Sequence, residues 1–101
     1  MQDTEGMDEM RMQIIDNTAK FARGLLKFGL VEQANGIYLV SPYNEAIKEI
    51  AKANGGKWSG GNRAWLFSDK NIITAEFISS LPEISGLTLE IHPDIASRCK
   101  L

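Results

Sequence analysis

The sequence predicts a small α+β domain in which helices pack on one face of a mostly antiparallel sheet. Three observations support this fold class. The chain has 101 residues, 44% of them hydrophobic, which suits one domain with a modest core. Helix-like and strand-like periods follow one another as helix, two strands, helix, two strands, helix, strand. Turn signals rich in Gly and Asn separate the paired strands, and such mixing over a short chain is typical of α+β domains.

The N-terminal part of the chain predicts a tail and then a helix. Residues 1–9 are acidic and lack periodicity, which is typical of a disordered tail. From Met10 to Lys27 apolar side chains recur at steps of three and four, which favours an amphipathic helix. The apolar stripe consists of Met12, Ile15, Ala19, Ala22, Leu25 and Leu26. A helix that ends near Gly24, followed by a strand over residues 25–32, is the alternative. The stripe can pack on the open sheet face or form a homodimer surface.

The next segment, residues 28–41, has the rhythm of two strands. Residues 30–32 and 37–40 read as strands that flank Asn35-Gly36, the dipeptide most typical of a hairpin turn. We therefore expect an antiparallel hairpin here.

A short helix and a second hairpin follow. Residues 44–53 predict a helix, since Pro42 suits a helix start and Asn54-Gly55-Gly56 can end one. The buried stripe of this helix is expected to be Ala46, Ile47, Ile50 and Ala51. The two strands of the second hairpin, joined by Gly60-Gly61-Asn62, are expected to be Lys57–Ser59 and Arg63–Phe67.

The C-terminal third predicts a helix, a strand and a tail. Ser68 or Asn71 is expected to cap the helix, and Pro82 to lie just past its end. Its apolar face consists of Ile73, Phe77, Ile78 and Leu81. Residues 87–91 alternate as a half-buried strand. The inward side chains of that strand are expected to be Leu87, Leu89 and Ile91. Residues 94–101 are predicted to be a tail.

Composition excludes several function classes. The net charge of −2 argues against wholesale electrostatic binding of nucleic acid. The lone Cys99 cannot form an intramolecular disulfide, and a single His without a Cys pair lacks the usual zinc patterns. No nucleophile has an acid–base partner, so we expect neither enzymatic activity nor a cofactor or metal. No apolar run reaches the length of a membrane span and no signal-peptide pattern opens the chain, so a cytoplasmic protein is expected.

Charge is distributed unevenly, and the basic zone coincides with the second hairpin. Between Lys48 and Lys70 there are five bases against two acids, and it is this local potential that a partner would meet. Four of these bases are candidate phosphate contacts, two on the helix and two on the hairpin: Lys48, Lys52, Lys57 and Arg63.

Aromatic residues accompany these cations. Trp58 lies between glycines on a short strand, so its indole can stack on a nucleobase, and Tyr43 can do the same. The alternatives are structural: Trp58 can pack on the domain, and Tyr43 can pack at the helix start. Trp65 and Phe67 lie two residues apart on one strand and share a face, which favours their filling the core.

These residues resemble the HARP domain, a module attached to annealing-helicase ATPases. The matching positions are Tyr43 before the helix, Ile47 and Ile50 within it, Lys57-Trp58, and Arg63 ahead of Trp65-Leu66-Phe67. The likeness covers residues 37–93 and implies a β-α-β-β-α-β unit, preceded here by the N-terminal helix and first hairpin strand over residues 10–36. The sequence is also similar to a small Trp-bearing module of plasmid and phage replication or conjugation proteins. It has no P-loop and no helicase core, so the resemblance implies binding without ATP-driven annealing.

Two functional hypotheses follow. The first is a non-enzymatic module for nucleic acid, single-stranded or junction DNA above all, that uses the basic and aromatic hairpin. The second is a small regulator of phage or plasmid type that binds and inhibits a host protein, because acidic ends and a nearly neutral total suit a protein partner.

Overall fold

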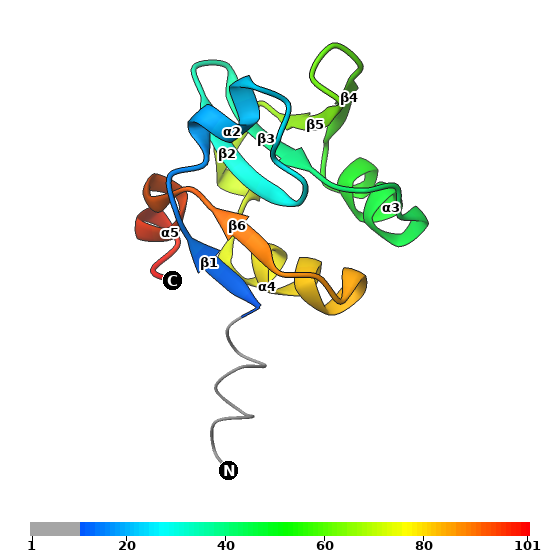
Figure 1. Ribbon diagram of the computed structural model, residues 1–101. Coiled ribbons are helices and arrows are strands. Elements are labelled where there is room, and N and C mark those ends of the chain that lie inside the picture. The colour runs from blue at the N-terminus through cyan, green and yellow to red at the C-terminus, as the bar shows by residue number, and fades with distance from the viewer. Residues whose placement is uncertain (1–10) are drawn as a thin grey trace.

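The structure of the protein is a computed structural model, and it describes residues 11–101 (Figure 1). The predicted α+β class is confirmed: in this part of the chain six strands form one sheet and four α-helices pack against it. The predicted acidic tail, residues 1–9, lies outside the described residues. The strands are β1 (Met12–Ile14), β2 (Gly29–Gln33), β3 (Gly36–Val40), β4 (Lys57–Ser59), β5 (Ala64–Phe67) and β6 (Leu89–Ile91). The helices are α2 (Thr18–Ala22), α3 (Glu45–Ala53), α4 (Ala75–Ser85) and α5 (Pro93–Arg98), with a 3₁₀ turn η1 (Lys70–Ile72) before α4.

The sheet is mixed: three of its five strand pairs are antiparallel, in line with the mostly antiparallel sheet that was predicted, and two are parallel. Its strand order is β1-β6-β2-β3-β5-β4. The pairs β2–β3 and β4–β5 are antiparallel, as the two predicted hairpins require, and β3 pairs with β5 in the same sense. Strand β6 returns to lie between β1 and β2 and is parallel to both, which Figure 1 shows as the orange arrow beside the blue one. A parallel pair needs a long connection, and here the chain between β2 and β6 supplies it.

The sheet buries both of its faces. Ile37 and Leu39 of β3 point to a large core covered by α3, α4 and α5. Tyr38 points the other way, into a smaller cluster with Leu26 that the ring of Phe21 from α2 covers. Helices therefore lie on both faces, and the expectation that they share one face is wrong.

The predicted N-terminal helix does not form as one element. The chain instead makes β1, then the single-turn helix α2, and Gly24 follows in a left-handed conformation (φ 72°). Asn17 is fully buried and its amide donates to the carbonyl oxygens of Leu30 (3.1 Å) and Glu90 (3.4 Å). A buried amide with such partners fixes a bend where the periodicity suggested a continuous helix. The expected apolar stripe, and the homodimer surface built on it, is thus divided between two elements.

The first hairpin is confirmed, but its two-residue turn is Ala34-Asn35 rather than the expected Asn35-Gly36, because Gly36 pairs with Gln33 and opens β3. Gly36 has a φ of 145°, and a Cβ atom there would lie 2.5 Å from the carbonyl oxygen of Phe67. The close packing of β3 on β5 therefore requires glycine at this position.

Helix α4 begins and ends later than predicted. Thr74 caps it by accepting from the amide of Phe77 (3.2 Å), whereas Asp69 caps η1. Pro82 lies inside the helix, buried, and Gly86 ends it with a φ of 73°. The expected caps at Ser68 and Asn71 and the expected stop at Pro82 are therefore wrong.

The C-terminal residues form a helix rather than a tail. Pro93 occupies the first turn of α5, and the Nδ1 atom of His92 accepts from the amide of Asp94 (3.1 Å). Ile95 and Ala96 are buried in the large core, so burial stabilises a helix too short to form alone.

The strand before α5 is shorter than predicted. β6 begins at Leu89, so Leu89 and Ile91 are buried whereas Leu87 is 45% exposed. None of the helices among residues 11–101 is long and apolar enough to cross a membrane.

Candidate nucleic-acid interface

The β4–β5 hairpin projects from the edge of the sheet and carries both tryptophans of the chain. Trp58 lies directly opposite Trp65 in the antiparallel register. Their ring centroids are 5.3 Å apart and the ring planes meet at 64°, an edge-to-face contact. The turn at residues 60–63 is held by backbone hydrogen bonds from Asn62 to Ser59 (3.2 Å) and from Arg63 to Gly60 (3.3 Å).

The start of α3 faces this hairpin. Asn44 caps the helix, because its side-chain oxygen accepts from the backbone amide of Ile47 (3.1 Å). Pro42 cannot continue β3 and turns the chain toward the helix. Tyr43, immediately before the cap, is left on the surface with 81% of its area exposed. The predicted helix over residues 44–53 is confirmed, within a residue at its start.

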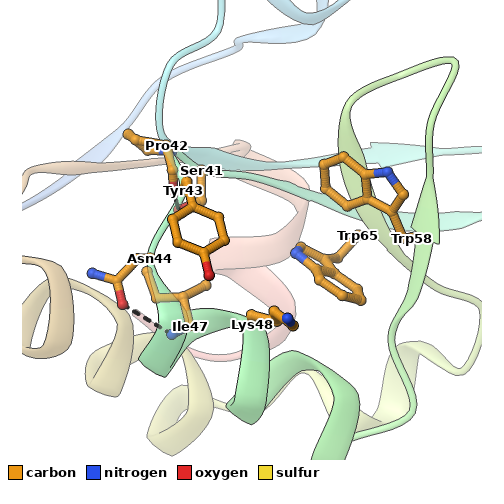
Figure 2. Close-up of a pocket in the computed structure, with 8 residues that line it drawn as sticks. All are labelled: Ser41, Pro42, Tyr43, Asn44, Ile47, Lys48, Trp58 and Trp65. Carbon is orange, nitrogen blue, oxygen red and sulfur yellow. Dashed lines mark hydrogen bonds between the residues drawn. The ribbon is translucent and has the colours of Figure 1, made fainter.

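Between these two elements lies a hollow of about 440 Å³, which we call the aromatic cleft. Its lining residues are Ser41, Pro42, Tyr43, Asn44, Ile47, Lys48, Trp58 and Trp65. Figure 2 shows the Tyr43 ring on one side of the cleft, the two indoles on the other, and Lys48 between them at the lower edge. Trp58 is 56% exposed, so much of its ring is available to a ligand.

Hydrogen bonds and charges at the rim centre on Glu45. The Tyr43 hydroxyl donates to the Glu45 carboxylate, which raises the pKa of Tyr43 and lowers the pKa of Glu45. The Lys48 ammonium lies 3.9 Å from the same carboxylate and lowers that pKa further. An exposed pair of this kind is weak, so Lys48 can exchange Glu45 for another anion.

Of the four predicted phosphate contacts, Lys48 lines the aromatic cleft. Lys52 is exposed one turn further along α3 and lies outside the cleft lining. Neither Lys52 nor the two cations of the hairpin forms an ion pair with any carboxylate among residues 11–101.

The two cations of the hairpin lie apart from Trp58. Lys57 is paired with Leu66, which belongs to the smaller cluster, and so points to the face opposite Trp58. Arg63 ends the turn and lines a second hollow on that opposite side. The structure thus brings Tyr43, Lys48 and Trp58 together and distributes the other cations around the hairpin.

The aromatic residues differ in burial. Phe67 is fully buried in the large core, as predicted. Trp65 packs against that core on one side and lines the aromatic cleft on the other, a second role that the sequence prediction missed. The signal was present, since two tryptophans that pair across a tight hairpin must lie on one face.

No group of three His, Cys, Asp or Glu side chains within residues 11–101 is placed to hold a metal ion. The lone Cys99 is half-buried, and its thiol donates to the carbonyl oxygen of Ile73 (3.2 Å).

The chain matches no family model, and neither a curated protein nor a solved structure is significantly similar to it.

Proposed function

We propose that the protein binds single-stranded nucleic acid, including the unpaired stretches of a DNA junction, by taking a nucleobase into the aromatic cleft. The observation that supports this most is that two exposed rings, Tyr43 and Trp58, border one apolar hollow, and that Lys48 is the one cation among residues 11–101 that lines it. A nucleobase is a flat ring with two apolar faces, and its phosphate would meet the lysine. The resemblance to the HARP domain points in the same direction and stays a prediction.

The exposed rings of the cleft favour an unpaired base over a duplex. In a double helix the faces of each base are covered by its neighbours, so a side chain cannot stack on them. A single strand offers these faces at no unpairing cost. The chain as a whole has a net charge of −2, so attraction to a polyanion is local: between Lys48 and Lys70 five bases stand against two acids.

The test is a titration of a labelled short oligothymidylate, followed by fluorescence anisotropy, with the matching duplex as competitor. Trp58→Ala is expected to weaken binding by about 5- to 150-fold, which corresponds to about 1–3 kcal/mol for one stacked base. Tyr43→Phe keeps the ring and should bind like the unmodified protein, whereas Tyr43→Ala should not. Because both tryptophans line the cleft, their fluorescence should be quenched on binding.

Leu87→Ala is the matched control, because Leu87 is an exposed apolar residue that lines neither hollow. Equal losses in Leu87→Ala and Trp58→Ala, or a preference for the duplex, would contradict the proposed site.

One observation favours the second hypothesis, a regulator that binds a protein. The cleft wall combines Pro42, Tyr43 and two indoles, and Tyr and Trp dominate the energetic centres of protein interfaces. Glu45 at the rim would also accept a basic side chain. A flat oligonucleotide titration at low salt would favour this alternative over nucleic-acid binding.

A further inference from the structure

A second hollow lies on the opposite side of the sheet from the aromatic cleft. Its volume is about 470 Å³, and we call it the basic cleft. The loop after α2, the end of β3 and the β4–β5 turn enclose it. Its lining residues are Phe21, Gly24, Leu25, Leu26, Lys27, Val40, Ser41, Pro42, Asn62 and Arg63.

The charge of the basic cleft is of one sign. Lys27 and Arg63 are its ionisable residues, both are exposed, and no carboxylate lines the hollow. Neither cation forms an ion pair with a carboxylate in the described part of the chain. Asn62 adds a neutral donor, because its amide donates one N–H to the Ser59 hydroxyl (3.0 Å) and has a second, whereas the Ser41 hydroxyl donates to the carbonyl oxygen of Pro42 (2.7 Å). Two unpaired cations beside such a donor suit a phosphate oxygen, which accepts hydrogen bonds from both kinds of donor.

The two clefts are neighbours. Ser41 and Pro42, which follow the end of β3, line both of them and form the ridge between them. A strand whose base occupies the aromatic cleft can therefore cross this ridge and continue along the basic cleft. The hairpin supplies Trp58 to the first hollow and Arg63 to the second.

We propose that the basic cleft binds the sugar–phosphate backbone of the nucleotides next to the one stacked in the aromatic cleft, with Lys27 and Arg63 as its phosphate contacts. This inference depends on the proposed function and adds to it a path for the strand and a residue, Lys27, that lies far from the hairpin in sequence.

The experiment compares two double variants that remove the same charge. Lys27→Gln with Arg63→Gln empties the basic cleft of cations, and Arg11→Gln with Lys100→Gln removes two exposed cations that line neither hollow. Each variant is titrated with the labelled oligothymidylate at several salt concentrations, and circular dichroism with thermal unfolding verifies its fold.

Loss of two phosphate contacts should reduce the slope of log affinity against log salt by about 1.4, since each contact on a single strand contributes about 0.7. Between about 50 and 200 mM salt, the affinity of this variant should therefore fall by a factor about sevenfold smaller than that of the unmodified protein. Quenching of the tryptophans at saturation should persist, because the base still stacks in the aromatic cleft. In the control variant the slope should fall by less than half of this amount.

The remaining outcomes overturn the inference in distinguishable ways. Equal slopes in the two double variants, or an unchanged slope in the Lys27 and Arg63 variant, would mean that the basic cleft is no subsite, while binding itself stands. Failure of the unmodified protein to bind any oligonucleotide would overturn the proposed function and the inference together.

Discussion

At Arg63 the backbone conformation favours glycine, whereas the proposed phosphate contact needs the charged side chain. It has a φ of 52°, in the left-handed region that costs an ordinary residue about 1–2 kcal/mol. A tight turn of this kind is most easily closed by Gly or Asn, and the three residues before it are Gly60, Gly61 and Asn62. The arginine therefore stabilises the turn less than a glycine would.

We predict that Arg63→Gly raises the free energy of unfolding by about 1 kcal/mol, because glycine adopts this conformation without the steric cost. Urea denaturation measures the change. Arg63→Ala retains the Cβ atom and should gain little, which makes it the matched control. If binding involves this residue, Arg63→Gly gains stability and loses affinity, a combination that misfolding cannot explain. If the glycine variant is no more stable than the alanine variant, the backbone at Arg63 is not strained as we propose.

At the scale of elements, one carboxylate connects three of them. Glu32 of β2 accepts from Lys70 of η1 (2.6 Å) and from Arg98 of α5 (3.0 Å). The hydrogen bond from Lys70, followed by that from Arg98, lowers the pKa of Glu32 below its ordinary value. The Glu32 carboxylate thus links β2, η1 and α5 through charge.

This arrangement has a pH dependence of definite sign. A carboxyl whose pKa is lowered on folding contributes stability above its unfolded pKa, about 4.3, and loses it as the pH falls through the lower folded value. We predict that Glu32→Gln is less stable than the unmodified protein at pH 7 by about 1 kcal/mol, the upper range for exposed pairs. The difference should vanish in acid, and thermal unfolding from pH 7 to pH 2 measures it.

Glu83→Gln removes an exposed carboxylate on α4 and is the control. A difference between the Gln variant of Glu32 and the unmodified protein that persists at the lowest pH would show that packing, rather than charge, is responsible.

Local signals explain which elements could be predicted. The helix α3 was predictable because Asn44, the apolar stripe and Asn54-Gly55 all agree within a dozen residues. Both hairpins carried their own turn residues. The helix predicted for the N-terminal segment was wrong because part of its apolar pattern belongs to a strand. Met12 packs on the core from β1, while Ile15 is exposed.

The candidate site was predictable in part for the same reason. Tyr43 and Trp58 belong to local motifs and were found, whereas the partition of the cations between two faces depends on strand register. A one-residue step along β4 separates Lys57 from Trp58 by the whole thickness of the sheet. Lys27 could not be found at all, because only the tertiary fold brings its loop to the β4–β5 turn.

For the whole molecule, the fold depends on residues far from the clefts. Leu89, Ile91 and Ile95 are fully buried in the large core. Each such side chain contributes about 1.5–3 kcal/mol, so together they match much of the stability of a small domain, about 5–15 kcal/mol. We predict that a chain without residues 87–101 shows no cooperative thermal transition, although every residue of the aromatic cleft is present.

Removal of residues 100–101 alone is the control and should leave the transition in place, since Leu101 is partly exposed and Lys100 is exposed. A cooperative transition in the shorter chain, followed by circular dichroism, would show that the hairpins and α3 fold without β6.

The position of β6 also has a consequence for synthesis. Among the strands of residues 11–101, β6 is synthesised after the other five, yet it fills a place in the interior of the sheet, between β1 and β2. The nascent chain can form its hairpins early, yet β1 has no neighbour until residue 91 emerges, and one edge of β2 stays open to other chains meanwhile. Slow translation of the residues that lead up to β6 would therefore lengthen the interval in which the open edge of β2 needs the protection of a chaperone.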